Sequence, residues 1–446
     1  MSSSRRKFIK KVSAGSSLMA LGGIGYGFSA SSYSRISGAN DRVVVGVMGT
    51  NGRGKSMAAN FALQDNTEVS HICDVEDKAL KKGLDAVTNA VGKTPKSEKD
   101  IRKMLELKDI DAVYLAPPDH WHTPATILSC AAGKHVYAEK PLSHNPAEGE
   151  MAIQAARKYN RVVQMGAQRR SWTKLTEGIN KLRNGVIGNV YMAKTWYTNN
   201  RGPIGIGKVV PVPSNLDYEL WQGPAPRRPY KDNLIHYNWH WFWHWGTGEA
   251  LNNGTHEIDV ARWGLGLDYP SKVHSVGGRY RYKDDWETTD TQLITFECEK
   301  GAAIVWEGRS CNGNMVEGLD RGVIFYGEKG SLHTGHDGYT IYDLDDNIVE
   351  EVKAEVVVDG RNTASPNAVL DIPHIQNFLD CVRNGGTPNA DVEIGHKSTL
   401  WVQLGNIAQR VGRSINIDQN NGHILSDPEA MNLWGREYEP GWAPKF

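Results

Sequence analysis

The segment Gly49-Thr50-Asn51-Gly52-Arg53-Gly54 has the residue types and spacing of a turn that binds phosphate. It stands between a β-branched run and a helical stretch. In a G-x-G-x-x-G turn, this arrangement places backbone N–H groups at a helix N-terminus against a pyrophosphate. Asn51 occupies the middle glycine position, and we expect the turn to tolerate it because asparagine accepts left-handed backbone angles. The predicted nucleotide site includes Gly49, Asn51, Gly52, Arg53 and Gly54.

Asp74 strengthens this prediction because it ends the next predicted strand, 20 residues after Gly54. A carboxylate at that place accepts hydrogen bonds from the ribose hydroxyls of adenosine. Val75 follows it, so no basic side chain is adjacent to hold a 2′-phosphate. We therefore predict NAD rather than NADP as the cofactor. The alternative is an ordinary glycine turn beside a surface aspartate.

Alternating strands and helices must position these residues. Short apolar runs predict buried strands, and the stretches between them predict helices; the strands are expected at 41–48, 68–74, 111–118 and 134–141, and the helices at 55–63, 77–91, 97–107 and 122–133. A further unit at 161–168 closes the series. Repeated β–α units predict a doubly wound parallel sheet, the Rossmann type, over residues 40–165.

The pattern changes in the second half of the chain. From residue 188 to about 358, alternating strands and turns predict one large open antiparallel sheet, and helices are expected at 371–383 and 395–411. The predicted fold class is therefore α/β. It has a Rossmann domain, then a C-terminal α/β domain at 166–413 and an irregular arm at 414–446.

The stretch "DAVYLAPPDHWHTPATILSCAAGKHVYAEKPLSHN" at 111–145 resembles the Gfo/Idh/MocA family of sugar and inositol oxidoreductases, and "AEKP" at 138–141 is its most specific mark. The resemblance runs from about Asp41 to Ile407. It implies that the open sheet carries the substrate site and often the oligomer interface, so a homo-oligomer (dimer or tetramer) is expected. In that family the EKP lysine, here Lys140, lies beside the nicotinamide and the reacting carbinol. A lysine beside a cationic ring has a lowered pKa and can exchange the carbinol proton.

Three further residues complete the predicted cofactor site. Pro118, His122 and Glu139 stand at the predicted carboxyl ends of strands, where doubly wound sheets bind their ligands. His122 could instead begin a helix without a ligand role.

A second motif of the family is a glycine-rich turn followed by Asp-x3-His on a helix, and "GTGEALNNGTHEIDVARWGLG" at 246–266 resembles it. His256 matches the histidine, but Asn252 stands where the family has aspartate, on the same helix face. An asparagine cannot take a proton, so Asn252 is predicted to orient the substrate or His256. Lys140 and His256 remain the predicted acid/base groups, and Asp259 either orients His256 or forms a salt bridge.

The aromatic segment "HYNWHWFWHWG" at 236–246 is predicted to be an irregular loop or a short helical turn, because its tryptophan and histidine periods conflict. Trp241 and Trp243 are expected to stack on a sugar ring. The alternative is a hydrophobic plug between domains. Histidines spaced by four raise the question of a metal, but the family mostly works without one and no carboxylate stands at Asp-x-His spacing. No metal site is predicted.

The N-terminal sequence Ser4-Arg5-Arg6-Lys7-Phe8-Ile9-Lys10 fits a twin-arginine export signal. The apolar stretch at 12–30 is too weakly hydrophobic for a spanning helix. We therefore predict a signal peptide over 1–39, cleaved near 37–39 or 27–30, with the twin-arginine export machinery as partner and the periplasm as destination. No stable membrane anchor is expected. The alternatives are a basic cytosolic tail and an uncleaved anchor.

Composition excludes other classes of partner. The first 39 residues hold six basic and no acidic side chains, which leaves 45 basic and 51 acidic residues, a net charge of −6, in the remainder. Such a chain has no electrostatic reason to bind nucleic acid or anionic lipid. Its five cysteines are scattered without a CxxC, so neither a disulfide framework nor a zinc site is predicted.

These features predict an NAD-dependent oxidoreductase acting on a secondary carbinol of a sugar, glycoside or polyol. A periplasm has no free NAD pool, whereas twin-arginine export carries folded proteins, so the cofactor is expected to be loaded in the cytoplasm and recycled in place. One alternative is a glycosidase or epimerase that works by transient oxidation. Another is a non-catalytic periplasmic sugar-binding protein.

Overall fold

Six parallel strands form the first sheet in the computed structural model, which describes residues 41–298, 301–336, 338–353 and 368–445. The predicted export signal at 1–39 lies outside the described residues. In spatial order the strands are β3 (Lys96–Glu98), β2 (Thr67–Cys73), β1 (Val43–Met48), β4 (Ala112–Leu115), β5 (His135–Ala138) and β6 (Val163–Met165). Every residue of β1 is buried, in line with its unbroken apolar sequence.

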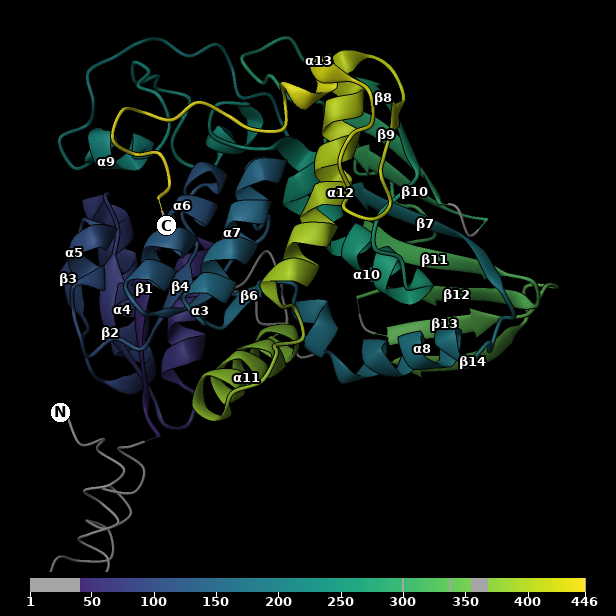
Figure 1. Cartoon of the computed structure of the whole chain (residues 1–446), viewed down its shortest axis with the longest axis horizontal. Helices are drawn as coiled ribbons and strands as arrows, with labels where there is room; N and C mark the ends of the chain where they lie inside the picture. The colour runs from purple at the N-terminus through teal and green to yellow at the C-terminus, as the bar shows by residue number, and fades with distance from the viewer. Residues whose placement is uncertain (1–40, 299–300, 337, 354–367, 446) are drawn as a thin grey trace, which may run out of the picture. The chain divides into compact units, whose positions relative to one another are not determined.

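Helices cover both faces of this sheet (Figure 1). On one face lie α3 (Arg53–Ala62), α4 (Asp77–Val91) and the late helix α11 (Ala368–Asn384), whose apolar side chains share one core with the strands. On the other face lie α5 (Ile101–Leu105), α6 (Asp119–Ala131) and α7 (Pro146–Lys158). The predicted Rossmann-type sheet is therefore confirmed.

One predicted helix differs in the structure. Residues 97–107 divide into the short edge strand β3 and the helix α5. The helix begins at Ile101 because the Asp100 side chain accepts a hydrogen bond from the Arg102 backbone N–H at 2.9 Å, which is an N-cap.

The second sheet has nine strands among the described residues, in the order β14-β13-β12-β11-β7-β10-β9-β8-β15. Their bounds in chain order are β7 Val190–Thr198, β8 Lys272–Gly278, β9 Thr291–Cys298, β10 Ala302–Arg309, β11 Arg321–Gly327, β12 Gly330–Thr334, β13 Gly338–Tyr342, β14 Ile348–Lys353 and β15 Ile415–Asn416. All neighbours are antiparallel except β7 and β10, which are parallel. The large antiparallel sheet was thus predicted, but not its parallel pair.

Three helices pack on one face of this sheet: α8 (Thr173–Arg183), α10 (Thr255–Leu265) and α12 (Val392–Val411) (Figure 1). Their side chains form one continuous core with the strands, represented by Ile179, Ile258 and Leu404. The arm beyond residue 414 is not wholly irregular, because it contributes β15 to the sheet edge and the helix α13 (Pro428–Met431).

A long segment between β7 and α10 runs across to the first sheet. It contains α9 (Tyr218–Gln222) and a 3₁₀ turn at Asn238–Trp241 within the aromatic segment. Leu216 forms a backbone bridge with Glu76, and His236 Nε2 lies 2.6 Å from a Glu76 carboxylate oxygen. Both sheets therefore belong to one compact unit, Val43–Phe446, and the domain boundary at 165/166 stays a prediction. Along the described chain, no helix combines the length and apolarity needed to cross a bilayer.

Candidate active site

The glycine-rich turn between β1 and α3 depends on two glycines. Gly49 has a φ of +84°, and a Cβ there would lie 2.5 Å from the carbonyl oxygen of Ala116. A Cβ on Gly54 would lie 1.6 Å from the carbonyl oxygen of Gly49. The turn is therefore as tight as the sequence predicts. Asn51 is not among the residues with positive φ, so the expectation that the turn uses its left-handed tolerance is wrong.

No side chain caps the N-terminus of α3. Gly52 is the N-cap and supplies no side-chain hydrogen bond, and no described atom lies within 4 Å of a Cβ built on it. Uncapped N–H groups at a helix N-terminus attract anions. The turn from Gly49 to Gly54 therefore fits the pyrophosphate of a dinucleotide and would hold it when NAD is bound.

Asp74 directly follows β2 and ties the end of this strand to the turn. Its carboxylate accepts hydrogen bonds from the backbone N–H groups of Thr50 at 2.7 Å and Glu76 at 3.0 Å. Burial raises its pKa, against the effect of these hydrogen bonds. Carboxylate oxygens have further lone pairs, so acceptors remain for ribose hydroxyls. The contact with ribose stays a prediction.

Lys140, Asn252 and His256, the three predicted catalytic residues, come together beyond the carboxyl end of β5. The Lys140 ammonium donates to the backbone oxygen of Asn252 at 2.7 Å and to its side-chain Oδ1 at 3.1 Å. Asn252 lies in a π-helical turn at Ala250–Gly254, and His256 in the first turn of α10. The sequence predicts a regular helix here; the wider π turn is a distortion that frequently accompanies functional sites.

Burial disfavours the charged forms of both basic groups. Burial lowers the pKa of Lys140, outweighing the raising effect of Glu139 and Asp119, while Arg321 lowers it further. Burial also holds the pKa of His256 well below its usual value, and the charges of Lys140 and Arg321 add to this. His256 is therefore neutral near neutral pH. Together the two groups can accept and return a proton, as acid–base catalysis requires.

Arg53 and Glu139, both predicted cofactor residues, are paired with each other. Arg53 Nε donates to Glu139 at 2.8 Å, and its two terminal nitrogens each donate to Asp371 at 2.8 Å. Tyr114 donates its hydroxyl to the same Glu139 oxygen at 2.9 Å. Burial acts to raise the pKa of Glu139, but Arg53 and Lys140 outweigh it and the pKa falls. These groups brace the turn against β4, β5 and α11.

Pro118 lies at the start of a helix, and His122 contacts backbone oxygens of the protein itself. Pro118 is the residue before α6, and His122 is buried with its two ring nitrogens 2.6 and 2.9 Å from the carbonyl oxygens of Pro141 and Pro117. His122 therefore holds two loops together, which favours the interpretation without a ligand role. Asp119, which sequence reasoning missed, accepts a hydrogen bond from Thr247 at 2.5 Å.

Trp241 and Trp243 do not form an open stacking surface. Trp241 is buried and stacks on Trp286, with ring centroids 4.0 Å apart. The guanidinium of Arg410 covers Trp243 at 4.9 Å from the ring centroid. The burial of Trp241 favours the hydrophobic-plug interpretation for that ring, whereas sugar stacking by Trp243 stays a prediction.

The three histidines of the aromatic segment point to different partners. His236 meets Glu76, His240 Nδ1 lies 2.6 Å from the Tyr237 carbonyl oxygen, and His244 Nε2 lies 2.7 Å from that of Pro226. No group of metal-ligating side chains is found in the part of the chain that the structure describes.

Asp259 does not orient His256. Its carboxylate accepts hydrogen bonds from Arg170 Nε at 2.9 Å and from the Ser398 hydroxyl at 2.5 Å. Of the two alternatives for this residue, the salt bridge is the one that the structure shows.

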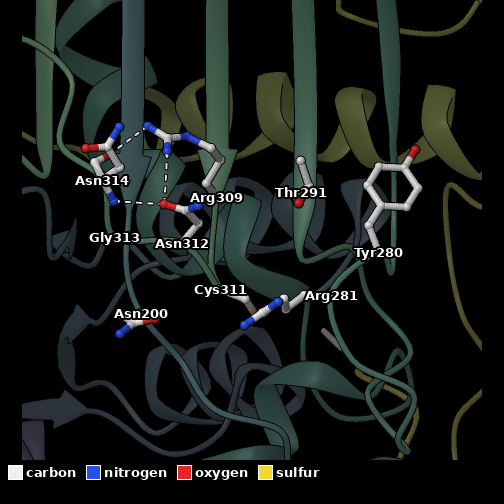
Figure 2. A pocket seen from close by; sticks show the side chains of 9 residues that line it. All are labelled: Asn200, Tyr280, Arg281, Thr291, Arg309, Cys311, Asn312, Gly313 and Asn314. Carbon is white, nitrogen blue, oxygen red and sulfur yellow. Dashed lines mark hydrogen bonds between the residues drawn. The ribbon is translucent and has the colours of Figure 1, made fainter.

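A hollow of about 760 Å³ opens at the end of the large sheet (Figure 2). Its lining includes the polar side chains of Asn200, Arg281, Arg309 and Asn312. Asn200 precedes Arg201, whose guanidinium binds Glu249 next to Asn252. The residues that line the hollow do not include Lys140, Asn252 or His256.

Two descriptions of one oxidoreductase family match the chain. The "NAD-binding Rossmann fold" of the Gfo/Idh/MocA family matches residues 43–167, and its "C-terminal alpha/beta domain" matches residues 193–443. Myo-inositol 2-dehydrogenase of Thermotoga maritima is 24% identical over 293 residues, 65% of this chain and 74% of that one. A glycosyl hydrolase family 109 protein of Saccharopolyspora erythraea is 35% identical over 107 residues, a match that spans only 23% of either chain.

Solved structures share the fold. An aldose–aldose oxidoreductase of Caulobacter crescentus, complexed with glycerol, superposes with a TM-score of 0.62 at 19% identity, over 84% of this chain and 100% of that one. At this identity the likeness concerns the fold alone. The two family matches together cover most of the chain and include the glycine turn, Lys140 and His256. The chain belongs to the Gfo/Idh/MocA family of NAD-binding oxidoreductases.

Proposed function

We propose that this protein is an exported oxidoreductase acting on a secondary carbinol of a sugar, glycoside or polyol, with NAD that stays bound and is recycled in place. The observation that carries the proposal is the Lys140–Asn252 contact beside a neutral His256, at the edge of the nucleotide-binding sheet. The substrate class is supported by the names of relatives, which include an inositol dehydrogenase and an aldose–aldose oxidoreductase.

The proton chemistry follows from the residues at the site. When bound, NAD supplies the hydride acceptor and, on return, the hydride donor. Lys140 in its neutral form accepts the carbinol proton, and neutral His256 holds a neighbouring hydroxyl or takes the proton onward. Asn252 cannot ionise, so it positions Lys140 instead of relaying a proton. The proton therefore stays on Lys140 or His256, available for return.

The twin-arginine stretch at 4–10 supports recycling in place. A folded protein can leave the cytoplasm with its cofactor loaded, and outside there is no pool with which to exchange it. The hydride and proton taken from one carbinol must then be returned to a carbonyl before the next cycle. A second sugar can receive them, which gives an exchange of oxidation state between two sugars.

A second candidate returns the hydride to the same molecule. Oxidation of a ring hydroxyl to a carbonyl acidifies the adjacent C–H, loss of that proton expels a glycosidic group or inverts the carbon, and water or a proton adds before reduction. The net reaction is then hydrolysis or epimerisation, with no net redox change. The match to a glycosyl hydrolase family 109 protein and the replacement of the family's aspartate by Asn252 favour this candidate.

A panel of glycosides and free sugars tests the proposal. The purified protein with its own NAD is mixed with each compound while absorbance at the NADH band and product release are followed together. We expect at least one compound to give product, with an absorbance change limited to one turnover per chain. A protein that loses all bound NAD during purification and reacts with no sugar would be a non-catalytic binder, which would overturn the proposal.

A further inference from the structure

A buried carboxylate stands beside Asn252, at a position to which no role has been assigned. Glu249 is 2% exposed. Its Oε1 accepts a hydrogen bond from the side-chain amide of Asn252 at 3.1 Å and another from the amide of Asn253. Its Oε2 accepts from Arg201 Nε at 2.5 Å. Arg201 thus balances the charge of Glu249, while the two amides satisfy its remaining acceptor sites.

The contact with Glu249 fixes which end of the Asn252 amide faces Lys140. An amide has one donor end and one acceptor end. Because Asn252 donates its NH₂ to Glu249, its Oδ1 is the atom that faces the Lys140 ammonium at 3.1 Å. The reverse orientation would place the NH₂ against the ammonium and the oxygen against the carboxylate, leaving both contacts repulsive.

The neutral amide of Asn252 therefore lies between the carboxylate of Glu249 and the ammonium of Lys140. Lys140 is held by two neutral oxygens of Asn252, whereas a carboxylate at 252 would stabilise its charged form directly. The other charged or titratable groups that act on Lys140 come from several elements, namely Glu139, Asp119, Arg321, Arg53, His240 and His256. Burial lowers the pKa of Lys140 in these surroundings.

We propose that Glu249 is a positioning residue that acts through the Asn252 amide to keep a neutral oxygen, Asn252 Oδ1, against the Lys140 ammonium. The inference deepens the proposed function and rests on it, because it gives the structural reason why Lys140 can take a proton although the family's aspartate is missing. It concerns the state of Lys140 itself, so it can be measured without a sugar substrate.

A cycle of variants tests whether Glu249 acts through Asn252. The rate at which acetic anhydride labels Lys140 is measured by peptide mass spectrometry across pH, on NAD-loaded protein, and its midpoint reports the titration of Lys140. We expect Glu249→Gln to lower this midpoint by roughly 0.5–2 pH units, since the Asn252 oxygen is no longer held against the Lys140 ammonium. In an Asn252→Ala background the same substitution should have little effect.

Asn253→Ala is the matched control, because it removes the other amide that donates to Glu249. The shift caused by Glu249→Gln should persist in that background. Equal shifts in both backgrounds would overturn the proposal.

A second measurement covers the case in which Glu249→Gln fails to fold. Asn252→Asp places two carboxylates about 3 Å apart, and like charges at this distance cannot both ionise freely. Its melting temperature at pH 8 should fall by at least about 1 °C, with a smaller deficit at pH 5, where one carboxylate is protonated. Adding Glu249→Gln, if that protein folds, should recover the loss because the amide and carboxylate have exchanged places. A deficit that does not change with pH would contradict the contact. Because no sugar is used, these results stay separate from any failure to find a substrate.

Discussion

Two neutral oxygens of Asn252 hold the ammonium of Lys140 at the candidate active site. At the scale of single residues, this contact distinguishes the protein from a dehydrogenase with an acid at the same position. Lys140 can lose its proton because burial disfavours its charge, and Asn252 cannot replace it as a proton carrier. Proton handling therefore falls to Lys140, with His256 beside it.

Replacing Lys140 tests this assignment. Lys140→Ala should slow the chemical step by about 10²–10⁴-fold, the usual loss for a general acid or base. NAD should remain bound, because the glycine turn and Asp74 lie elsewhere. Single-turnover kinetics on the true substrate, with the NAD content of the same sample, measures both effects. Lys134→Ala is a suitable control, since Lys134 also donates to backbone carbonyls, at 2.6 and 2.9 Å, but outside the site. Full activity of Lys140→Ala would show that another group moves the proton.

Asp74 should determine the choice between NAD and NADP. Its carboxylate is held at the end of β2 and would repel a 2′-phosphate while accepting ribose hydroxyls. We expect NAD to bind far more tightly than NADP, and Asp74→Ala to narrow the difference. Calorimetry on protein stripped of cofactor measures the two affinities. Equal affinities in the unaltered protein would contradict this role.

The residues that sequence reasoning located are those with short-range signals. Gly49, Gly54 and Asp74 lie within one β–α–β unit, where spacing alone indicates a nucleotide turn. Asp371, by contrast, reaches Arg53 across 318 residues, and only the folded position of α11 brings them together. The prediction that Trp241 stacks on a sugar ring failed for another reason. A cluster of aromatic residues in the sequence is compatible with a binding site and with a hydrophobic core. In the structure, Trp241 is part of a core.

At the scale of elements, the helices and strands with strong apolar periodicity were predicted well and those defined by distant partners were not. The strand β3 has the sequence Lys-Ser-Glu, which carries no strand signal, and it forms only because β2 offers a free edge. The π turn at Ala250–Gly254 was also missed, because its sequence is compatible with an ordinary helix. In β3, pairing with a neighbouring strand overrode local propensity.

The junction of β1 and α3 offers a direct test with an internal control. Gly54→Ala should lose NAD and lower the free energy of unfolding by about 1–3 kcal/mol, the usual cost of overpacking, because its methyl group would overlap the Gly49 carbonyl. Gly52→Ala should cost less than Gly54→Ala, since a methyl group there meets nothing within 4 Å apart from its chain neighbours, and only the backbone angles, φ −119° and ψ −95°, oppose it. Denaturant unfolding and the amount of NAD released measure the two effects. Similar behaviour of both variants would show that the turn has another geometry.

At the scale of the whole molecule, the segment between β7 and α10 links the two sheets. Leu216 and His236 both contact Glu76, which follows β2. Glu249 and Asn252 lie at the other end of this segment, where Asn252 contacts Lys140. The predicted adenosine end of the cofactor site and the catalytic end are thus joined by one stretch of chain. Such long-range connections are what the sequence could not predict.

The proposed twin-arginine export concerns the N-terminal segment and needs its own test. Changing Arg5→Lys together with Arg6→Lys should trap the protein in the cytoplasm, because the export machinery requires the paired arginines of the segment at 4–10. Fractionation of cells followed by immunoblotting measures the distribution, with a matched Lys10→Arg variant as control. Unchanged periplasmic yield of the double variant would contradict twin-arginine export.

The central claim is that NAD stays bound and is recycled in place, and one measurement tests it most directly. Protein collected from the periplasm is dialysed extensively, its NAD content is determined by mass spectrometry after denaturation, and turnover of a reactive glycoside is followed with and without added NAD. We expect close to one NAD per chain and steady turnover that added NAD does not change. Turnover that stops after one cycle and resumes only when NAD is supplied would contradict it.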